Sequence, residues 1–124
     1  MTAQEVVFRR VPAAYEPGFL ALREGPILAA AVVSAPEAMI RTVGPALDGF
    51  SDLPDEEREM LFETFRVWQD NDACVRDAAE ALFCHPNTVR YRLRKIEVRS
   101  GRSLSRPKDV VELYLAFEVH RRLM

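Results

Sequence analysis

The chain has 124 residues, 48% of them hydrophobic and 29% charged, so it is long and apolar enough to fold around a core of its own. It contains no run of 18 or more apolar residues, which argues against a membrane-spanning helix, and we expect a soluble, cytoplasmic protein. The two cysteines, Cys74 and Cys84, have only one neighbouring histidine, too few ligands for a zinc site, so we expect buried free thiols, no metal and no cofactor.

The net charge of −2 is unlike that of a generic nucleic-acid-binding protein, but the charge is strongly segregated along the chain. Residues 55–80 hold nine acidic and three basic side chains, a local charge of −6. Residues 85–108 hold eight basic side chains and a single acid, Glu97, a local charge of +7. A basic patch of this size can dominate contact with a phosphate backbone, while the acidic flank limits indiscriminate binding.

The first fifty residues are predicted to form a small α/β segment. Residues 5–11 are β-prone and residues 26–34 are a second short apolar run, so we expect two strands, with a brief helix or a loop over Phe19–Arg23 between them. Pro36 opens a helix to about Leu47. Such a segment buries little by itself, so it must dock on the rest of the chain, dimerise, or be the remnant of a larger domain.

A helix is predicted from Asp55 to about Gln69. Its first turn is acidic, as the helix dipole prefers, and Ser51 or Asp52 can cap it. Apolar and aromatic side chains recur at i, i+4 and i+7 from Leu61, so they belong to a core face rather than to a ligand site.

The next two helices have the layout of a helix-turn-helix. A short helix of about two turns begins near Val75, with Asp72 as its candidate cap, and a turn of three to four residues leads to a longer basic helix over residues 86–100. Short helix, turn and longer basic helix is the order found in helix-turn-helix DNA-binding modules.

The basic helix 86–100 is the centre of the functional prediction. His85 can precede it, Pro86 can take its first position, and Gly101 can supply a left-handed stop. At about 100° per residue the helix has a packing side and an opposite side. The packing side holds Val89, Leu93 and Ile96, and the opposite side holds Asn87, Tyr91, Arg94, Lys95 and Val98.

A last helix is predicted over residues 107–122, starting at Pro107. It is apolar around most of its circumference. One side should cover the helix-turn-helix core. The remainder either meets a second subunit or is buried against the first fifty residues, and the sequence leaves both alternatives open.

The run from Leu61 to Leu123 contains the motif HPNTVRYRLRKIE, which starts at His85, the later SGRSL and the Pro107 helix. This run closely resembles the C-terminal helix-turn-helix domain of the PucR and CdaR family of bacterial transcriptional regulators. Such regulators usually carry a degenerate GGDEF-like α/β domain before it. The resemblance implies a regulatory remnant over 1–50 and the DNA-binding domain over 51–124. The expected fold is therefore mainly α, a bundle of about four helices over 55–122 preceded by a small α/β segment.

If the basic helix enters the major groove of DNA, its exposed side chains can be sorted into two groups. Amide and guanidinium groups read adenine and guanine edges, and an aromatic ring can stack on a base. Side chains around the helix rim contact phosphates and set the register without reading sequence. We expect base readout by Asn87, Arg90, Tyr91 and Arg94, and phosphate contacts by His85, Thr88, Arg92, Lys95, Arg99 and Arg102. For each arginine the alternative is a solvated helix face.

The expected partner is double-stranded DNA, bound by a homodimer with half-sites about 34 Å apart, and helix 107–122 is a candidate dimer interface. The resemblance implies that any effector is a small metabolite bound outside the motifs of this chain. A helical protein-interaction module is the alternative. An enzyme is not expected, because the sequence has no paired carboxylates with a histidine, no nucleophile motif and no glycine-rich phosphate loop.

Overall fold

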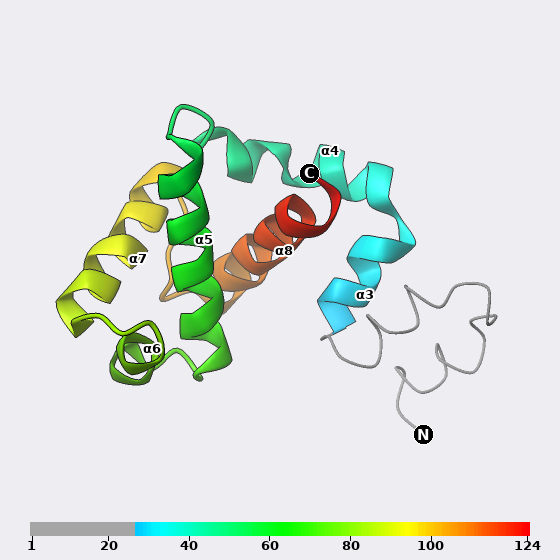
Figure 1. Ribbon diagram of the computed structural model, residues 1–124. Coiled ribbons are helices and arrows are strands. Elements are labelled where there is room, and N and C mark those ends of the chain that lie inside the picture. The colour runs from blue at the N-terminus through cyan, green and yellow to red at the C-terminus, as the bar shows by residue number, and fades with distance from the viewer. Residues whose placement is uncertain (1–26) are drawn as a thin grey trace, which may run out of the picture.

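The computed structural model describes residues 27–124, and every regular element in this part of the chain is a helix (Figure 1). None of these helices is both long and apolar enough to cross a membrane. The helices follow one another as α3 (Ile27–Ser34), α4 (Pro36–Asp48), α5 (Asp55–Asp70), α6 (Val75–Ala81), α7 (Pro86–Ser100) and α8 (Pro107–Leu123).

The predicted fold class is wrong for the first part of the chain. Residues 27–34, expected as a strand, form α3, and no strand occurs between residues 27 and 124. A short apolar run does not distinguish a buried strand from a buried helix, and the three alanines of this run favour the helix. The other predicted strand, residues 5–11, and the segment Phe19–Arg23 lie outside the described residues. The helix predicted from Pro36 is confirmed as α4.

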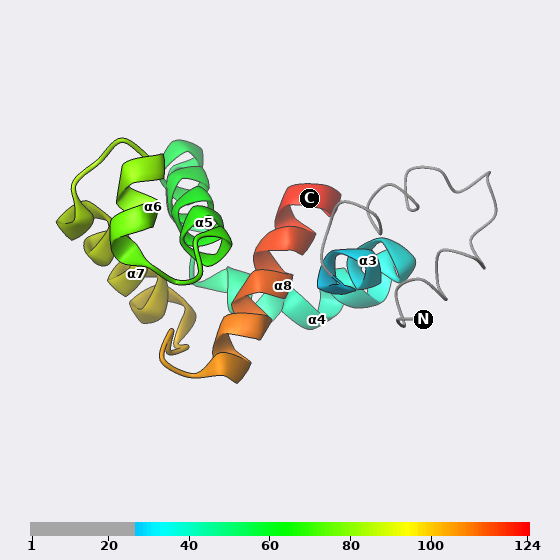
Figure 2. The ribbon, with the colours of Figure 1, turned by 90° about the horizontal axis from the view of Figure 1, so that it is seen from below.

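The helices form two groups on either side of the molecule (Figures 1 and 2). The first group consists of α5, α6 and α7, in which α6 and α5 both pack on α7. In the second group α3 and α4 pack on α8. α4 also contacts α7, so it links the two groups.

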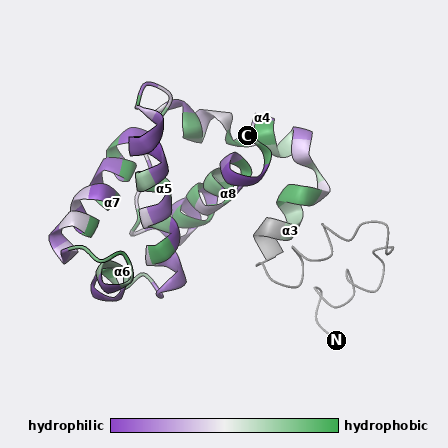
Figure 3. Cartoon of the chain, viewed as in Figure 1, coloured by the Kyte–Doolittle hydropathy of each residue, from purple (hydrophilic) through white to green (hydrophobic). Residues whose placement is uncertain are grey.

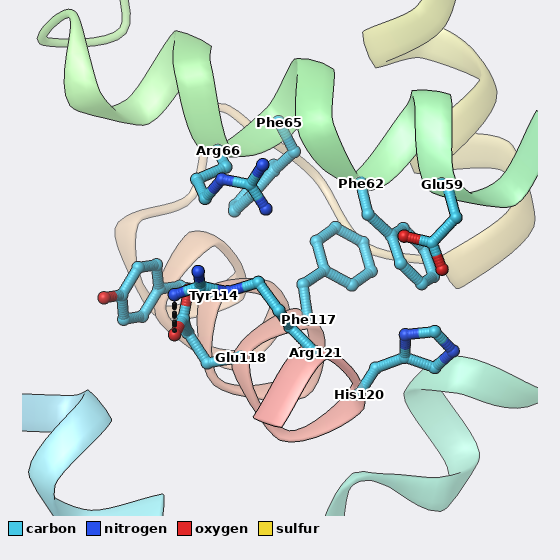
Figure 4. Close-up of a pocket in the computed structure, with 9 residues that line it drawn as sticks. All are labelled: Glu59, Phe62, Phe65, Arg66, Tyr114, Phe117, Glu118, His120 and Arg121. Atoms are coloured by element: carbon cyan, nitrogen blue, oxygen red, sulfur yellow. Dashed lines mark hydrogen bonds and ion pairs between the residues drawn. The ribbon is translucent and has the colours of Figure 1, made fainter. Parts of the chain in front are cut away.

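Four phenylalanines join the two groups in the core. Phe62 and Phe65 of α5 point toward Phe117 of α8 (Figure 4), with ring centroids 4.1 and 5.0 Å from that of Phe117. Phe50, between α4 and α5, packs edge-on against Phe62 at 5.1 Å and Phe117 at 5.8 Å. All four are buried. This aromatic cluster, Phe50, Phe62, Phe65 and Phe117, therefore holds α8 on the helix-turn-helix side of the molecule.

Most of the apolar surface of α8 is covered within the chain. Its buried side chains include Leu113, Ala116 and Val119, and its neighbours are α3 and α4 (Figure 3). Val111 is the large apolar residue of α8 that stays 46% exposed. Burial against the preceding segment, one of the two alternatives left by the sequence, thus accounts for most of this helix.

α8 also carries a buried acid. Glu118 is 4% exposed and accepts hydrogen bonds from Arg121 and Arg122, both at 2.8 Å (Figure 4 shows the pair with Arg121). Burial by itself raises the pKa of Glu118, but the hydrogen bonds from the two arginines outweigh it, so the pKa lies below its usual value. Glu118 is therefore ionised and paired near neutral pH.

The predicted side-chain caps of α5 and α6 are wrong. α5 follows Pro54 and α6 follows Cys74, and neither start has a side-chain cap hydrogen bond. Of the expected capping residues, Asp52 instead pairs with Arg99. Cys74 and Cys84 are free but half-buried rather than fully buried.

Gly49, directly after α4, lies against the backbone at the end of α7. A methyl group at this position would lie 1.8 Å from the carbonyl oxygen of Arg99. Because that neighbour is backbone, it cannot move aside as a side chain can. The residue at position 49 must therefore lack a Cβ for the end of α4 to rest on the end of α7.

Replacing Gly49 by alanine should lower the free energy of unfolding by about 1–3 kcal/mol, the usual cost of forcing extra volume into a packed site. Gly44→Ala is the matched control, because Gly44 lies in α4 and a methyl group added there would meet no atom within 4 Å. It should be neutral or stabilise the helix by up to about 1 kcal/mol. Urea denaturation measures both variants. Equal stability of the two would show that the approach to Arg99 does not constrain position 49.

Candidate nucleic-acid interface

The predicted bounds of the basic helix are confirmed: α7 runs from Pro86 to Ser100. His85 precedes it, and its Nδ1 accepts a hydrogen bond from the backbone N–H of Asn87 at 3.0 Å. Gly101 ends the helix with a φ of 70°, which is the left-handed region that glycine adopts without strain. Local sequence signals therefore determine both ends.

One side of α7 is anchored in the core. Val89, Leu93 and Ile96 are buried, as the helical spacing predicts. Ala78 and Ala79 of α6 are also buried, and their small side chains allow α6 and α7 to approach closely. This packing fixes which side of α7 faces solvent.

The four residues expected to read bases lie together on the outer face of α7. Asn87, Arg90, Tyr91 and Arg94 are all exposed, Tyr91 by 60%. Arg90 donates a hydrogen bond to the Asn87 Oδ1 at 2.9 Å, which aligns the amide and the guanidinium side by side. An amide, two guanidinium groups and a phenol thus form one polar surface, which we call the outer face.

The six residues expected to contact phosphates are divided by the structure. His85 is exposed and Thr88 is half-buried at the start of α7. The other four donate hydrogen bonds or ion pairs within the chain. Their partners are Thr64 for Arg92, Glu57 for Lys95, Asp52 and the Gly49 carbonyl for Arg99, and Glu112 for Arg102.

The contacts of Arg92, Lys95 and Arg99 lie on the flank of α7 that faces α5 and the α4–α5 loop. The Arg99 guanidinium is 2.6 Å from the Asp52 carboxylate. The hydrogen bond between them is the main reason that the pKa of Asp52 lies below its usual value. Lys95, which helical projection assigned to the exposed side, is half-buried beside Glu57. Lys95 and Arg99 are therefore each paired with an acid from another element, while Arg92 bonds the hydroxyl of Thr64.

Acidic groups also hold the connector between α7 and α8. Glu97 accepts a hydrogen bond from the backbone N–H of Leu104 at 2.8 Å, and Asp109 accepts one from that of Ser103 at 2.9 Å. Arg102 reaches Glu112 of α8 at 2.9 Å. The connector is thus fixed against both helices, while Arg106 at its end and Lys108 at the start of α8 are exposed.

The sequence did not reveal the acidic partners Asp52, Glu57 and Glu112. They lie 47, 38 and 10 residues from the cations they bind, so no local sequence spacing indicates the pairing.

The sequence analysis also did not single out Phe83, in the turn before α7, which is 96% exposed and has a φ of 55°. Non-glycine residues are uncommon in this backbone region.

Comparison with known proteins supports the helix-turn-helix assignment. Residues 61–119, about half of the chain, match the family model of the PucR C-terminal helix-turn-helix domain. This match begins within α5 and ends within α8, so it includes α6, α7 and the connector.

Several curated proteins are similar to about half of this chain. An uncharacterized protein of Haemophilus influenzae is 40% identical over 65 residues, 52% of this chain and 18% of that protein. The purine catabolism regulatory protein of Bacillus subtilis is 35% identical over 66 residues, 53% of this chain and 12% of that protein. An uncharacterized protein of Mycobacterium tuberculosis is 41% identical over 59 residues, 48% of this chain and 14% of that protein.

This chain therefore spans less than a fifth of the length of these relatives. No solved structure matches it significantly. Residues 61–119 are a helix-turn-helix domain of the PucR C-terminal family.

Proposed function

We propose that this chain is a transcriptional regulator that binds double-stranded DNA in a sequence-specific manner, with α7 in the major groove. The outer face of α7 is the observation that carries the proposal. A major groove about 12 Å wide admits one α-helix, and α7 presents its polar side chains on the side opposite its buried anchors. The PucR-type domain supports DNA binding as the general activity.

The proposed base contacts follow from the hydrogen-bonding groups. Asn87 can offer a donor and an acceptor to adenine, while Arg90 and Arg94 can each bind guanine through two N–H groups. Tyr91, between them on the helix, can stack on a base or bond to its edge. His85 and Thr88, at the start of α7, can contact phosphates and set the register.

We further propose a homodimer that places two copies of α7 about 34 Å apart on DNA, since one helix-turn-helix reads only a short site. The exposed Val111 on α8 is one residue through which such pairing can occur.

We also propose a boundary near residue 50, between a regulatory remnant and the DNA-binding part. α3 and α4 pack on α8, so a signal reaching them can be passed to the DNA-binding part.

Selection of bound duplexes from a random library by the full chain tests the proposal. We expect an enriched motif that contains adenine and guanine and that repeats at about one helical turn if the protein dimerises. Binding of the selected duplex should weaken with salt, with a log–log slope of about −0.9 for each phosphate contact. Recovery of unenriched sequences together with a flat salt response would refute DNA binding and favour a protein-interaction module.

A further inference from the structure

Three cations beside the outer face are paired with acids. Lys95 binds Glu57, Arg99 binds Asp52 at 2.6 Å, and Arg102 binds Glu112 at 2.9 Å. The side chains of the three cations are only 24–29% exposed. Each of these cations therefore already has an anionic partner within the chain.

The acids come from different parts of the fold. Asp52 lies in the α4–α5 loop, Glu57 in the first turn of α5, and Glu112 in α8. Arg90 and Arg94 differ, because no acidic side chain of residues 27–124 lies within 4.0 Å of their guanidinium groups. The pairing thus affects the flank of α7 and the connector, and it leaves the outer face open.

Carboxylates and phosphates compete for the same cations. A lysine or arginine in an ion pair must leave its acid before it can neutralise a phosphate, so the pair lowers the affinity for DNA of any sequence. Base contacts are unaffected, because they come from other side chains.

We propose that Glu57, Asp52 and Glu112 take the place of DNA phosphates as partners of Lys95, Arg99 and Arg102. These ion pairs keep the three cations from binding phosphates and thereby limit the affinity of the protein for DNA. The inference rests on the proposed DNA binding. It predicts that neutralising one of these acids releases one cation, and that each released cation adds one phosphate contact to complexes with any duplex.

The test compares Glu57→Gln with Glu56→Gln in the full chain, with a random-sequence duplex as the probe. The two acids are neighbours in the first turn of α5, and Glu56 is exposed and forms no ion pair in the part of the chain that the structure describes. Glu57→Gln should bind the duplex about fivefold more tightly at 0.1 M salt and steepen the salt slope by about 0.9. Glu56→Gln should leave the slope unchanged.

A second pair of variants isolates the cation. In a Lys95→Met background, Glu57→Gln should no longer change the slope, because the cation that it would release is absent. Asp52→Asn, an exchange in the exposed α4–α5 loop, is tested in the same way: it should no longer change the slope in an Arg99→Ala background. Circular dichroism checks that each variant is folded.

The outcomes separate the two proposals. The inference would be overturned if the unsubstituted chain binds DNA but the salt slopes are equal for Glu57→Gln, Asp52→Asn and Glu56→Gln. The proposed DNA binding would then still stand. Absence of salt-dependent binding by the unsubstituted chain and by every variant would overturn both. A steeper slope confined to Glu57→Gln and Asp52→Asn, and lost without Lys95 or Arg99, would establish the inference.

Discussion

Replacing Phe117 by alanine should lower the free energy of unfolding by about 3–5 kcal/mol, the usual cost of truncating a buried aromatic side chain. Phe117 contacts the rings of Phe50, Phe62 and Phe65, with centroid distances between 4.1 and 5.8 Å. Its loss opens a cavity between α5, α8 and the α4–α5 loop. A loss of this size is a large fraction of the stability of an ordinary domain, so the variant should unfold at a clearly lower temperature and urea concentration.

Val111→Ala is the matched control for Phe117→Ala. Val111 lies on the same helix but is 46% exposed, so its truncation should change stability by less than about 0.5 kcal/mol. Thermal and urea unfolding, followed by circular dichroism, compare the two variants. Similar stability of Phe117→Ala and Val111→Ala would show that the aromatic cluster does not join the two groups of helices.

The second large effect is expected at the outer face. Arg90→Ala and Arg94→Ala should each weaken binding to the selected duplex by about 1–3 kcal/mol, because each removes a two-point contact to a guanine. Binding to random duplexes should weaken much less. Both arginines are exposed, so their removal leaves no buried group without a partner, and the fold should persist.

Arg41→Ala controls for the loss of one positive charge, since Arg41 is exposed on α4, outside the helix-turn-helix. It should leave sequence preference unchanged. Fluorescence anisotropy with the selected and random duplexes at one salt concentration measures the preference directly. If Arg90→Ala, Arg94→Ala and Arg41→Ala weakened both duplexes alike, base readout by α7 would be wrong and only general charge attraction would remain.

Features determined by neighbouring residues were predictable from the sequence. The ends of α7 depend on His85, Pro86 and Gly101, and its buried side follows from the helical spacing of Val89, Leu93 and Ile96. The same holds for the grouping of the four outer-face residues, since i, i+3, i+4 and i+7 spacing places them on one side of a helix.

Features that depend on distant parts of the chain were not predictable. α3 was predicted as a strand because an eight-residue apolar run has no decisive period, and burial of the last helix against the first fifty residues was only one of two alternatives that the sequence left open. The candidate phosphate contacts were chosen by charge and helical position alone. Their acidic partners, such as Asp52 for Arg99, become neighbours only after the α4–α5 loop packs against α7.

The central claim is that α7 reads DNA sequence through its outer face. The most direct test is the ratio of the dissociation constants of the full chain for a scrambled duplex and for the selected duplex, measured at one salt concentration. We predict a ratio of about 10³ or more, typical of specific DNA binding, that falls sharply when Arg90 and Arg94 are both replaced by alanine. A ratio near one for the unsubstituted chain would contradict the claim.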